Sequence, residues 1–275
     1  MKQTKAEHLP VEKLCPFEGH PFQIRDDEEM DQLVWSVLTQ GILTPIVVRP
    51  LDTGQYEVIS GHRRVHACKK AGIERIPALI YNLDRDAAAI ALVDSNLHRE
   101  RILPSEKAFA YKLKMEAMSH QGQRSDLTSS QDEPKLRSDE QIAKENNESR
   151  ATVQRYIRLT RLIPELLQLV DEGRIALGHG VEIAVFDKKI QKLILDVYQS
   201  EERTPNLSQI VKLKHLENAG ALSEEAAMEI LLADKANQVE KVSFKYNDIQ
   251  KYFPRSYTPK QITDTILGLL DKWKK

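Results

Sequence analysis

The sequence predicts an α+β protein, in which a small mixed α/β domain is followed by an all-α domain and a small α/β C-terminal segment. Residues 1–80 alternate β-rich runs with helical patterns, whereas residues 104–220 follow helical patterns with short breaks. Only 6% of residues are aromatic, and the 29% that are charged occur in mixtures that favour helices. At roughly 100–200 residues per domain, a chain of 275 residues has room for two or three domains.

Local patterns define the elements of the N-terminal region. Gly41 and Gly72 stand where helices would end, and Asp52-Thr53-Gly54 is a turn signal between two β-rich runs. The expected elements are a helix over 30–40, two strands over 46–49 and 56–59 that form a hairpin or follow in sequence, a helix over 62–71 and a strand over 76–80.

The remainder of the chain is mainly helical in pattern. Asp84 is a suitable N-cap for a helix over 85–93, and Pro104 opens a long helix that we expect to run to about residue 120. Residues 121–137 carry almost no apolar side chain, which indicates a mobile loop. The tail has a helical stretch over 223–233, a β-like run over 242–246 and an amphipathic helix over 259–273. The predicted domains are 1–103, 104–220 with the mobile loop 121–137, and 221–275.

Composition excludes several classes of protein. With 40 Lys+Arg against 41 Asp+Glu, the chain has no uniformly basic surface, so binding to nucleic acid would need a local patch. Two cysteines, Cys15 and Cys68, cannot form a framework of several disulfides and indicate a reducing cytosol. No apolar run is long enough for a signal sequence or a membrane span, so we expect a cytoplasmic protein without membrane contact.

Gly61-His62-Arg63-Arg64 follows a predicted strand and opens a predicted helix, which is the setting of an anion site. Gly permits a positive φ, the N–H groups of the first helical turn point outward, and two arginines supply bidentate donors for phosphate. The alternative is a solvated basic helix start. His62 and His66 share the spacing of a zinc-protease helix, but Arg63 stands where that site needs a Glu, so metal binding is disfavoured.

Residues 138–157 scan as helix, tight turn and helix. Asn147 suits a left-handed turn, Ser149 suits the N-cap of the second helix, and that helix carries Arg side chains with no acidic residue from 149 to 161. The pattern predicts a DNA-binding helix-turn-helix, with a helical hairpin that has a solvated charged face as the alternative. The predicted base-contacting residues are Arg150, Thr152 and Gln154, and the predicted flanking contacts are Ser149, Arg155 and Arg158.

These motifs, in this order, resemble the ParB partition-protein family over roughly residues 9–220. His20-Pro21-Phe22-Gln23-Ile24-Arg25 is similar to the family's Asn-Pro-x-Gln-Pro-Arg segment, and residues 41–49 resemble the family's segment that leads into a strand. Residues 61–67 resemble its Gly-Glu-Arg-Arg-x-x-Ala box, with His62 in place of Glu. Residues 95–106 resemble its Glu-Asn-x-x-Arg box and the Leu-Pro-Ser-Glu that follows, and Gly178-His179-Gly180 resembles a turn after the helix-turn-helix.

The resemblance implies a ParB/sulfiredoxin-like N-terminal domain that binds CTP with Mg²⁺, a helix-turn-helix domain that reads a centromere-like site in double-stranded DNA, and a homodimer that acts as a DNA clamp. Asn96 would help to hold Mg²⁺. The nucleotide-binding positions that the resemblance implies are Gln23, Thr44, Gly61, His62, Arg63, Arg64, Asn96 and Arg99. The pattern is most similar to plasmid or mobile-element members from Gram-positive bacteria, located on the nucleoid or a plasmid.

Three departures leave alternatives open. Ser95 stands where the family has a Glu associated with nucleotide hydrolysis, and a hydroxyl cannot act as a general base near neutral pH, so CTP hydrolysis is left open. The chain lacks the basic N-terminal tail that engages a ParA-type ATPase, and residues 221–275 do not match the family's dimerisation domain. The rival functions are a transcriptional repressor without a nucleotide switch and an enzyme that uses Cys68 or His62 as nucleophile.

Overall fold

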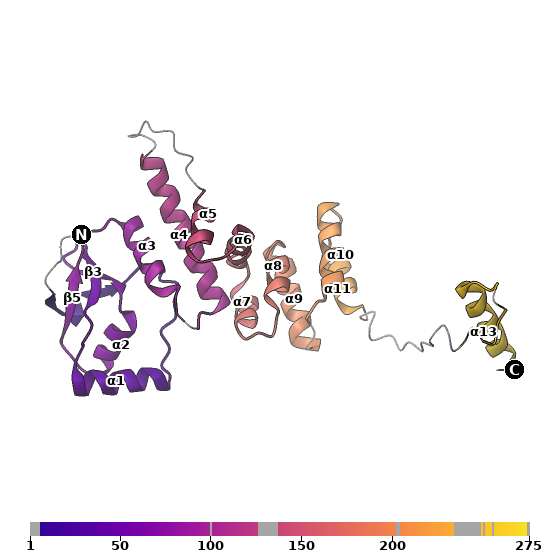
Figure 1. The fold of residues 1–275 in the computed structure, drawn as a ribbon, viewed down its shortest axis with the longest axis horizontal. Helices are drawn as coiled ribbons and strands as arrows, with labels where there is room; N and C mark the ends of the chain where they lie inside the picture. The colour runs from indigo at the N-terminus through magenta and orange to yellow at the C-terminus, as the bar shows by residue number, and fades with distance from the viewer. Residues whose placement is uncertain are drawn as a thin grey trace. The chain divides into compact units, whose positions relative to one another are not determined.

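The computed structural model describes residues 6–99, 101–125, 137–201, 204–233, 249, 251–254 and 256–273. The chain forms two compact units, Met1–Leu232 and Ala233–Lys275. The first unit combines a mixed five-stranded sheet with a long run of helices, which confirms the predicted α+β class (Figure 1). Its elements are β1 (Glu7–Pro10), the 3-10 helix η1 (Val11–Lys13), β2 (Leu14–Pro16), α1 (Glu28–Gln40), β3 (Ile46–Pro50), β4 (Tyr56–Ser60), α2 (His62–Lys70), β5 (Arg75–Ile80), α3 (Arg85–Asn96), α4 (Pro104–Ser125), α5 (Ser138–Glu145), α6 (Arg150–Leu159), α7 (Pro164–Asp171), α8 (Leu177–Ile183), α9 (Lys188–Glu201), α10 (Leu207–Asn218) and α11 (Glu224–Leu232).

The sheet has the strand order β1-β5-β3-β4-β2. The predicted hairpin forms, because β3 pairs with β4 antiparallel, and β5 then lies parallel to β3 on its other side. The edge strands β1 and β2 were not among the predicted elements. They have four and three residues and both end in proline, so neither shows an alternating pattern that a sequence reader can recognise.

Helices cover both faces of the sheet. Val58 and Ile59 are adjacent in β4, so their side chains point to opposite faces. Val58 packs with residues of α1 and α2, whereas Ile59 packs with residues of α3 and α4. The helix ends follow the sequence closely: Asp27 caps α1 by accepting from the Met30 N–H at 3.0 Å, and Gly41 ends it with φ 72°.

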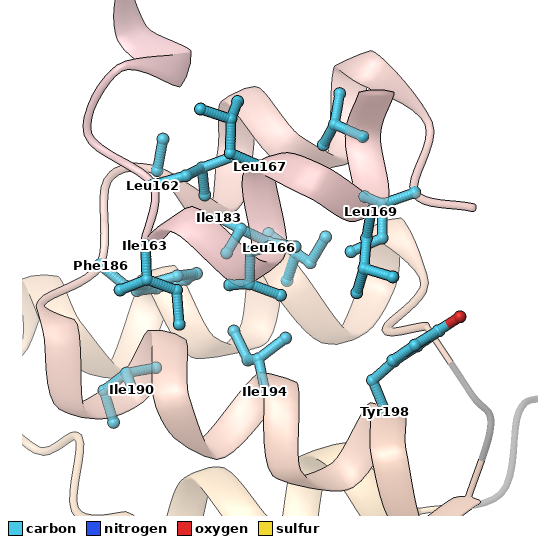
Figure 2. Packing of buried hydrophobic residues seen from close by; sticks show 14 of the residues in the cluster. Leu162, Ile163, Leu166, Leu167, Leu169, Ile183, Phe186, Ile190, Ile194 and Tyr198 are labelled. Carbon is cyan, nitrogen blue, oxygen red and sulfur yellow. The ribbon is translucent and has the colours of Figure 1, made fainter. Parts of the chain in front are cut away.

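The helical part of the first unit begins with α4, which runs to Ser125 and so is longer than predicted. Residues 121–125 of the predicted loop are therefore helical, since Gln and Arg favour helix and the single Gly122 does not end it. Residues 126–136 of that loop lie outside the described residues. Beyond α6, apolar side chains of α7, α8 and α9 meet in one core, where Leu166, Ile183 and Ile194 are buried (Figure 2).

The second unit contains α13 (Pro259–Trp273), at the position predicted for an amphipathic helix. The β-like run 242–246 lies outside the described residues, so the predicted α/β character of this segment stays a prediction. The boundaries of the three predicted domains also stay predictions.

Candidate functional site

A cavity of about 880 Å³ opens beside the start of α2, the start of α4 and the segment after α3. Four arginines and three carboxylates line it, so the cavity carries an excess of positive charge that suits an anion. The lining residues are Gln23, Arg25, Asp27, Glu29, Arg63, Arg99, Arg101, Ile102, Leu103 and Glu106.

Gly61 fixes how α2 begins at this cavity. Its φ is 100°, in the left-handed region, and a Cβ there would lie 2.7 Å from Cγ2 of Ile46. Only glycine fits this turn between β4 and the first turn of α2. The predicted strand–glycine–helix setting of the anion site is therefore present.

The two adjacent arginines of α2 have different surroundings. Arg63 lines the cavity, and its guanidinium forms an exposed ion pair with Glu29 at 3.2 Å. Arg64 instead donates from Nη1 to the carbonyl of Pro45 at 2.8 Å and also to the carbonyl of Thr44. Burial lowers the pKa of Arg64. Arg64, Thr44 and Gly61 thus form one structural contact behind the cavity, and none of the three lines it.

His62 is buried and packs against His20, with ring centroids 3.8 Å apart. Burial, together with the nearby charges of His20 and Arg99, lowers the pKa of His62 to about 3, so the ring is neutral at neutral pH. Nε2 of neither ring has a hydrogen-bond partner among the described residues. His62 is not part of the cavity lining, although its neighbour Arg63 is.

Arg99, in the segment after α3, lines the cavity, whereas Asn96, the last residue of α3, is not among the lining residues. Arg99 lies over the ring of Phe22, 5.4 Å from the centroid. Asn96 is buried, and its Nδ2 donates to the carbonyl of Leu92 at 2.7 Å and to Ser95 Oγ at 3.0 Å. In the part of the chain that is described, no group of three or more His, Cys, Asp or Glu side chains could hold a metal ion.

Glu106 connects the cavity to α4. Its Oε1 accepts from the backbone N–H of Gln23 at 2.8 Å, and its Oε2 accepts from the N–H of Leu103 at 3.1 Å. Gln23 and Leu103 both line the cavity, so its lining is attached to the first turn of α4. A ligand that moves this lining would therefore act on α4.

The helix-turn-helix forms as predicted, from α5, a turn and α6. Asn147 has φ 53°, and Ser149 caps α6 by accepting from the Thr152 N–H at 3.1 Å. Ile142 and Val153 are fully buried against Tyr111 of α4. The second helix is thus packed against α4 and α5 at its predicted position.

The predicted DNA-contacting residues lie together on α6 and its cap. Ser149, Arg150 and Arg155 are exposed, while Thr152, Gln154 and Arg158 are partly exposed. Nε of Arg150 donates to Oδ2 of Asp139 at 2.6 Å, and Nε2 of Gln154 donates to the same oxygen at 2.8 Å. Burial acts to raise the pKa of Asp139, but these hydrogen bonds and the charge of Arg150 outweigh it and lower the pKa.

Two side chains of α4, Lys114 and Tyr111, contact α3 and the helix-turn-helix. Lys114 is 2% exposed, and its Nζ lies 2.5 Å from both Asp94 of α3 and Glu145 of α5. Burial acts to lower the pKa of Lys114, but hydrogen bonds to the two carboxylates outweigh it, so the pKa is raised and the charge is kept. One helical turn earlier, Tyr111 donates to Glu148 at 2.9 Å, next to the turn before α6.

Sequence reasoning had not singled out Arg101 for the cavity, Asp139 for the helix-turn-helix, or Lys114 between them. Each takes its role from contacts with residues distant in the sequence or in another element. The only local signal was the position of Asp139 in the first turn of a helix that precedes a basic one. Among the described residues, no helix is long and apolar enough to cross a membrane.

Two family models match the chain: the ParB N-terminal domain over residues 1–97 and the ParB HTH domain over residues 129–212. The nucleoid occlusion protein of Geobacillus thermodenitrificans is 34% identical over 214 residues, which span 74% of this chain and 70% of that protein. The nucleoid occlusion protein of Bacillus mycoides is 28% identical over 265 residues, which span 92% of this chain and 85% of that protein.

Solved structures are also similar to the chain. The C-terminally truncated chromosome-partitioning protein ParB from Caulobacter crescentus, complexed to the centromeric parS site, is 23% identical with a TM-score of 0.44, covering 82% of this chain and 98% of that one. The same kind of truncated protein complexed with CTP-gamma-S is 26% identical with a TM-score of 0.33, covering 70% of this chain and 99% of that one.

Proposed function

Since the chain belongs to the ParB family of DNA-binding proteins, we propose that it is a partition-class DNA clamp whose loading on a centromere-like site is gated by CTP and Mg²⁺. The observation that supports this proposal best is the arginine-lined cavity, which is attached through Glu106 to the helix that packs against the helix-turn-helix. The clamp is a homodimer on nucleoid or plasmid DNA in the cytoplasm, with a ParA-type ATPase as a possible partner.

The triphosphate is proposed to bind at Arg63 and Arg99, whose guanidinium groups reach the cavity. Gln23 lies beside the nucleotide, and Gly61 allows the first turn of α2 to offer its N–H groups. Arg64 does not line the cavity and is proposed to act indirectly, by donating hydrogen bonds to the carbonyls of Thr44 and Pro45. His62 is proposed to support the start of α2 by packing against His20 as a neutral ring. The choice of cytosine as the base is supported by the family resemblance and not by the lining of the cavity.

Mg²⁺ would neutralise part of the triphosphate charge. It commonly binds proteins through one or two side-chain oxygens plus phosphate oxygens and water, so the lack of a three-residue cluster among the described residues is compatible with it. Asn96 is the proposed ligand through its amide oxygen, since its amide nitrogen already donates to Leu92. Ser95 cannot supply the carboxylate of a general base, so slow or absent hydrolysis is part of the proposal.

DNA is proposed to bind along α6. Arg150, Thr152 and Gln154 face base edges in the major groove, where Arg pairs with guanine and Gln with adenine. The cap residue and the remaining arginines hold phosphates, which fix register without reading sequence. These phosphate contacts are Ser149, Arg155 and Arg158.

Calorimetry with CTP, ATP, GTP and UTP in the presence of Mg²⁺ tests the nucleotide site. We expect that CTP, and none of the other three nucleotides, binds the full-length protein. We expect the affinity for CTP to fall at least tenfold in Arg63→Ala. Arg85→Ala is the matched control, because Arg85 is an exposed arginine of the same domain that does not line the cavity. Binding of none of the four nucleotides would contradict the proposal and favour the transcriptional repressor.

A further inference from the structure

Two side chains of α6 meet at one oxygen of a buried carboxylate. Arg150 and Gln154 both donate to Oδ2 of Asp139, which lies in the first turn of α5. The Asp139 side chain is 8% exposed, whereas that of Arg150 is 45% exposed. A buried group in one helix therefore holds two polar side chains that reach the surface of the next helix.

We propose that Asp139 is a positioning residue that determines DNA sequence specificity, because it sets which atoms of Arg150 and Gln154 face the bases. The inference rests on the proposed DNA-binding function of α6 and deepens it. Asp139 itself does not contact a base.

The hydrogen bonds leave a defined set of atoms free. With Nε engaged, Arg150 keeps Nη1, which lies 4.0 Å from Oε1 of Glu140, and Nη2 as two parallel donors that match O6 and N7 of guanine. With one N–H of Nε2 engaged, Gln154 keeps one donor and the acceptor Oε1, which match N7 and the N6 amino group of adenine. Without Asp139 the Gln154 amide is free to turn over, and this preference is lost.

The helix geometry adds a prediction about spacing. Arg150 and Gln154 are four residues apart, so they lie on one face of α6 and are separated by about 6 Å along its axis. With about 3.4 Å between base pairs, that separation corresponds to about two steps of DNA. The site read by this pair is therefore expected to contain a guanine and an adenine within about two base pairs of each other.

A purely structural role for Asp139 makes a different prediction. An ion pair that only ties α5 to α6 would, when removed, lower stability and weaken binding to every DNA sequence alike. A positioning role predicts weaker discrimination between bases while affinity for unrelated DNA stays equal or rises, because one negative charge near the phosphates is gone.

The test selects binding sequences from a duplex library with a randomised core, using the full chain without nucleotide, and compares wild type with Asp139→Asn. Glu140→Gln is the matched control: it removes the same charge one residue away, where Oε1 is 4.0 Å from Arg150. Fluorescence anisotropy on the selected duplex, base-substituted duplexes and a scrambled duplex measures discrimination, and thermal unfolding measures stability.

We expect wild type and Glu140→Gln to select one motif and to discriminate about tenfold at the positions read by Arg150 and Gln154. Asp139→Asn should keep the rest of the motif, discriminate threefold or less at those positions, and bind the scrambled duplex at least as well. If Asp139→Asn is unfolded, Asp139→Ser is assayed in its place. The same base preference in a folded Asp139 variant would overturn the inference, whereas a wild type that selects no motif would overturn the proposed DNA-binding function itself.

Discussion

Arg63 of the proposed nucleotide cavity and Arg150 of the proposed DNA-binding helix are held in different ways. Arg63 pairs with Glu29, whose side chain is 68% exposed, so the pair is open to water and a ligand can replace it. Arg150 pairs with Asp139, whose side chain is only 8% exposed, and Gln154 shares that carboxylate. Arg63 thus presents a positive charge to the cavity without a buried partner that fixes its direction. Arg150 and Gln154 present hydrogen-bond donors whose direction is fixed by Asp139.

This difference matches what each region is proposed to bind. Phosphate oxygens accept hydrogen bonds from many directions, so a phosphate site mainly needs positive charge and free donors. A base edge is recognised only by donors and acceptors in a set arrangement. The side chains held by Asp139 therefore suit the recognition of bases by α6. The exposed ion pair of Arg63, which a ligand can replace, suits the binding of phosphate in the cavity.

Stability should fall most when Lys114 is changed, because this residue joins α3 to α5 through Asp94 and Glu145. Lys114→Met keeps most of the side-chain volume but leaves Asp94 and Glu145 without their shared cation. Because these carboxylates are half exposed, water compensates part of the loss, and we expect about 2–4 kcal/mol less stability in urea unfolding. Adding Asp94→Asn and Glu145→Gln to Lys114→Met should recover part of the stability. A loss below about 0.5 kcal/mol would show that Lys114 does not stabilise the contact between α3 and α5.

The next effect is a pH dependence that arises from the buried His62 at the start of α2. The pKa of His62 is lowered from 6.5 to about 3, so between these values a proton binds the unfolded chain and not the folded one. The stability due to neutral His62 is therefore complete above about pH 6.5 and is lost as the pH falls toward 3. Between pH 7 and pH 5 this amounts to about 2 kcal/mol.

Urea unfolding at a series of pH values measures this loss. His62→Gln, which cannot take up a proton, should show a flatter decline over the same range. An unchanged profile in His62→Gln would assign the acid sensitivity to other groups.

Substitutions of the two adjacent arginines of α2 should affect different properties, one mainly stability and the other mainly ligand binding. Arg64→Ala leaves the carbonyls of Thr44 and Pro45 without their donor and should cost about 1–2 kcal/mol of stability. Arg63→Ala removes only an exposed pair, so stability should change by less than about 0.5 kcal/mol while CTP affinity falls. Thermal and urea unfolding beside calorimetry distinguish the two variants. Equal losses of stability would remove the contrast between them.

The smallest effect concerns phosphate contacts on α6. Arg155→Ala should weaken binding to specific and scrambled duplexes alike and should lower the slope of log affinity against log salt by about 1. Gln154→Ala, one residue away, should instead relax base preference with little change in slope. Anisotropy titrations at several salt concentrations compare the two, and a selective loss of base preference in Arg155→Ala would reverse their assignment.

Elements with local signals could be predicted from the sequence. Gly41 ends α1, Asn147 takes the left-handed turn, and Ser149 caps α6, because each depends on its own side chain and its near neighbours. The short strands β1 and β2 escaped prediction, since they exist only through pairing with β5 and β4.

The side-chain directions at the candidate site could not be predicted in the same way. Arg63 and Arg64 look equivalent in the sequence, yet Arg64 turns to carbonyls about 20 residues away in the chain. Apart from the position of Asp139 in the first turn of α5, the sequence does not indicate that Asp139 holds Arg150 and Gln154, because that contact depends on how α5 packs on α6. Proximity in the fold decides these roles, and no local pattern encodes it.

In the proposed clamp, a nucleotide controls how long the protein stays on DNA. The most direct measurement is the lifetime of the complex on a duplex that carries the selected motif and is blocked at both ends, followed after a rise in salt, with and without CTP and Mg²⁺. We expect that CTP prolongs retention on the blocked duplex, that ATP does not, and that Arg63→Ala abolishes the effect of CTP while initial binding persists. Equal lifetimes with and without CTP in the wild type would contradict the claim.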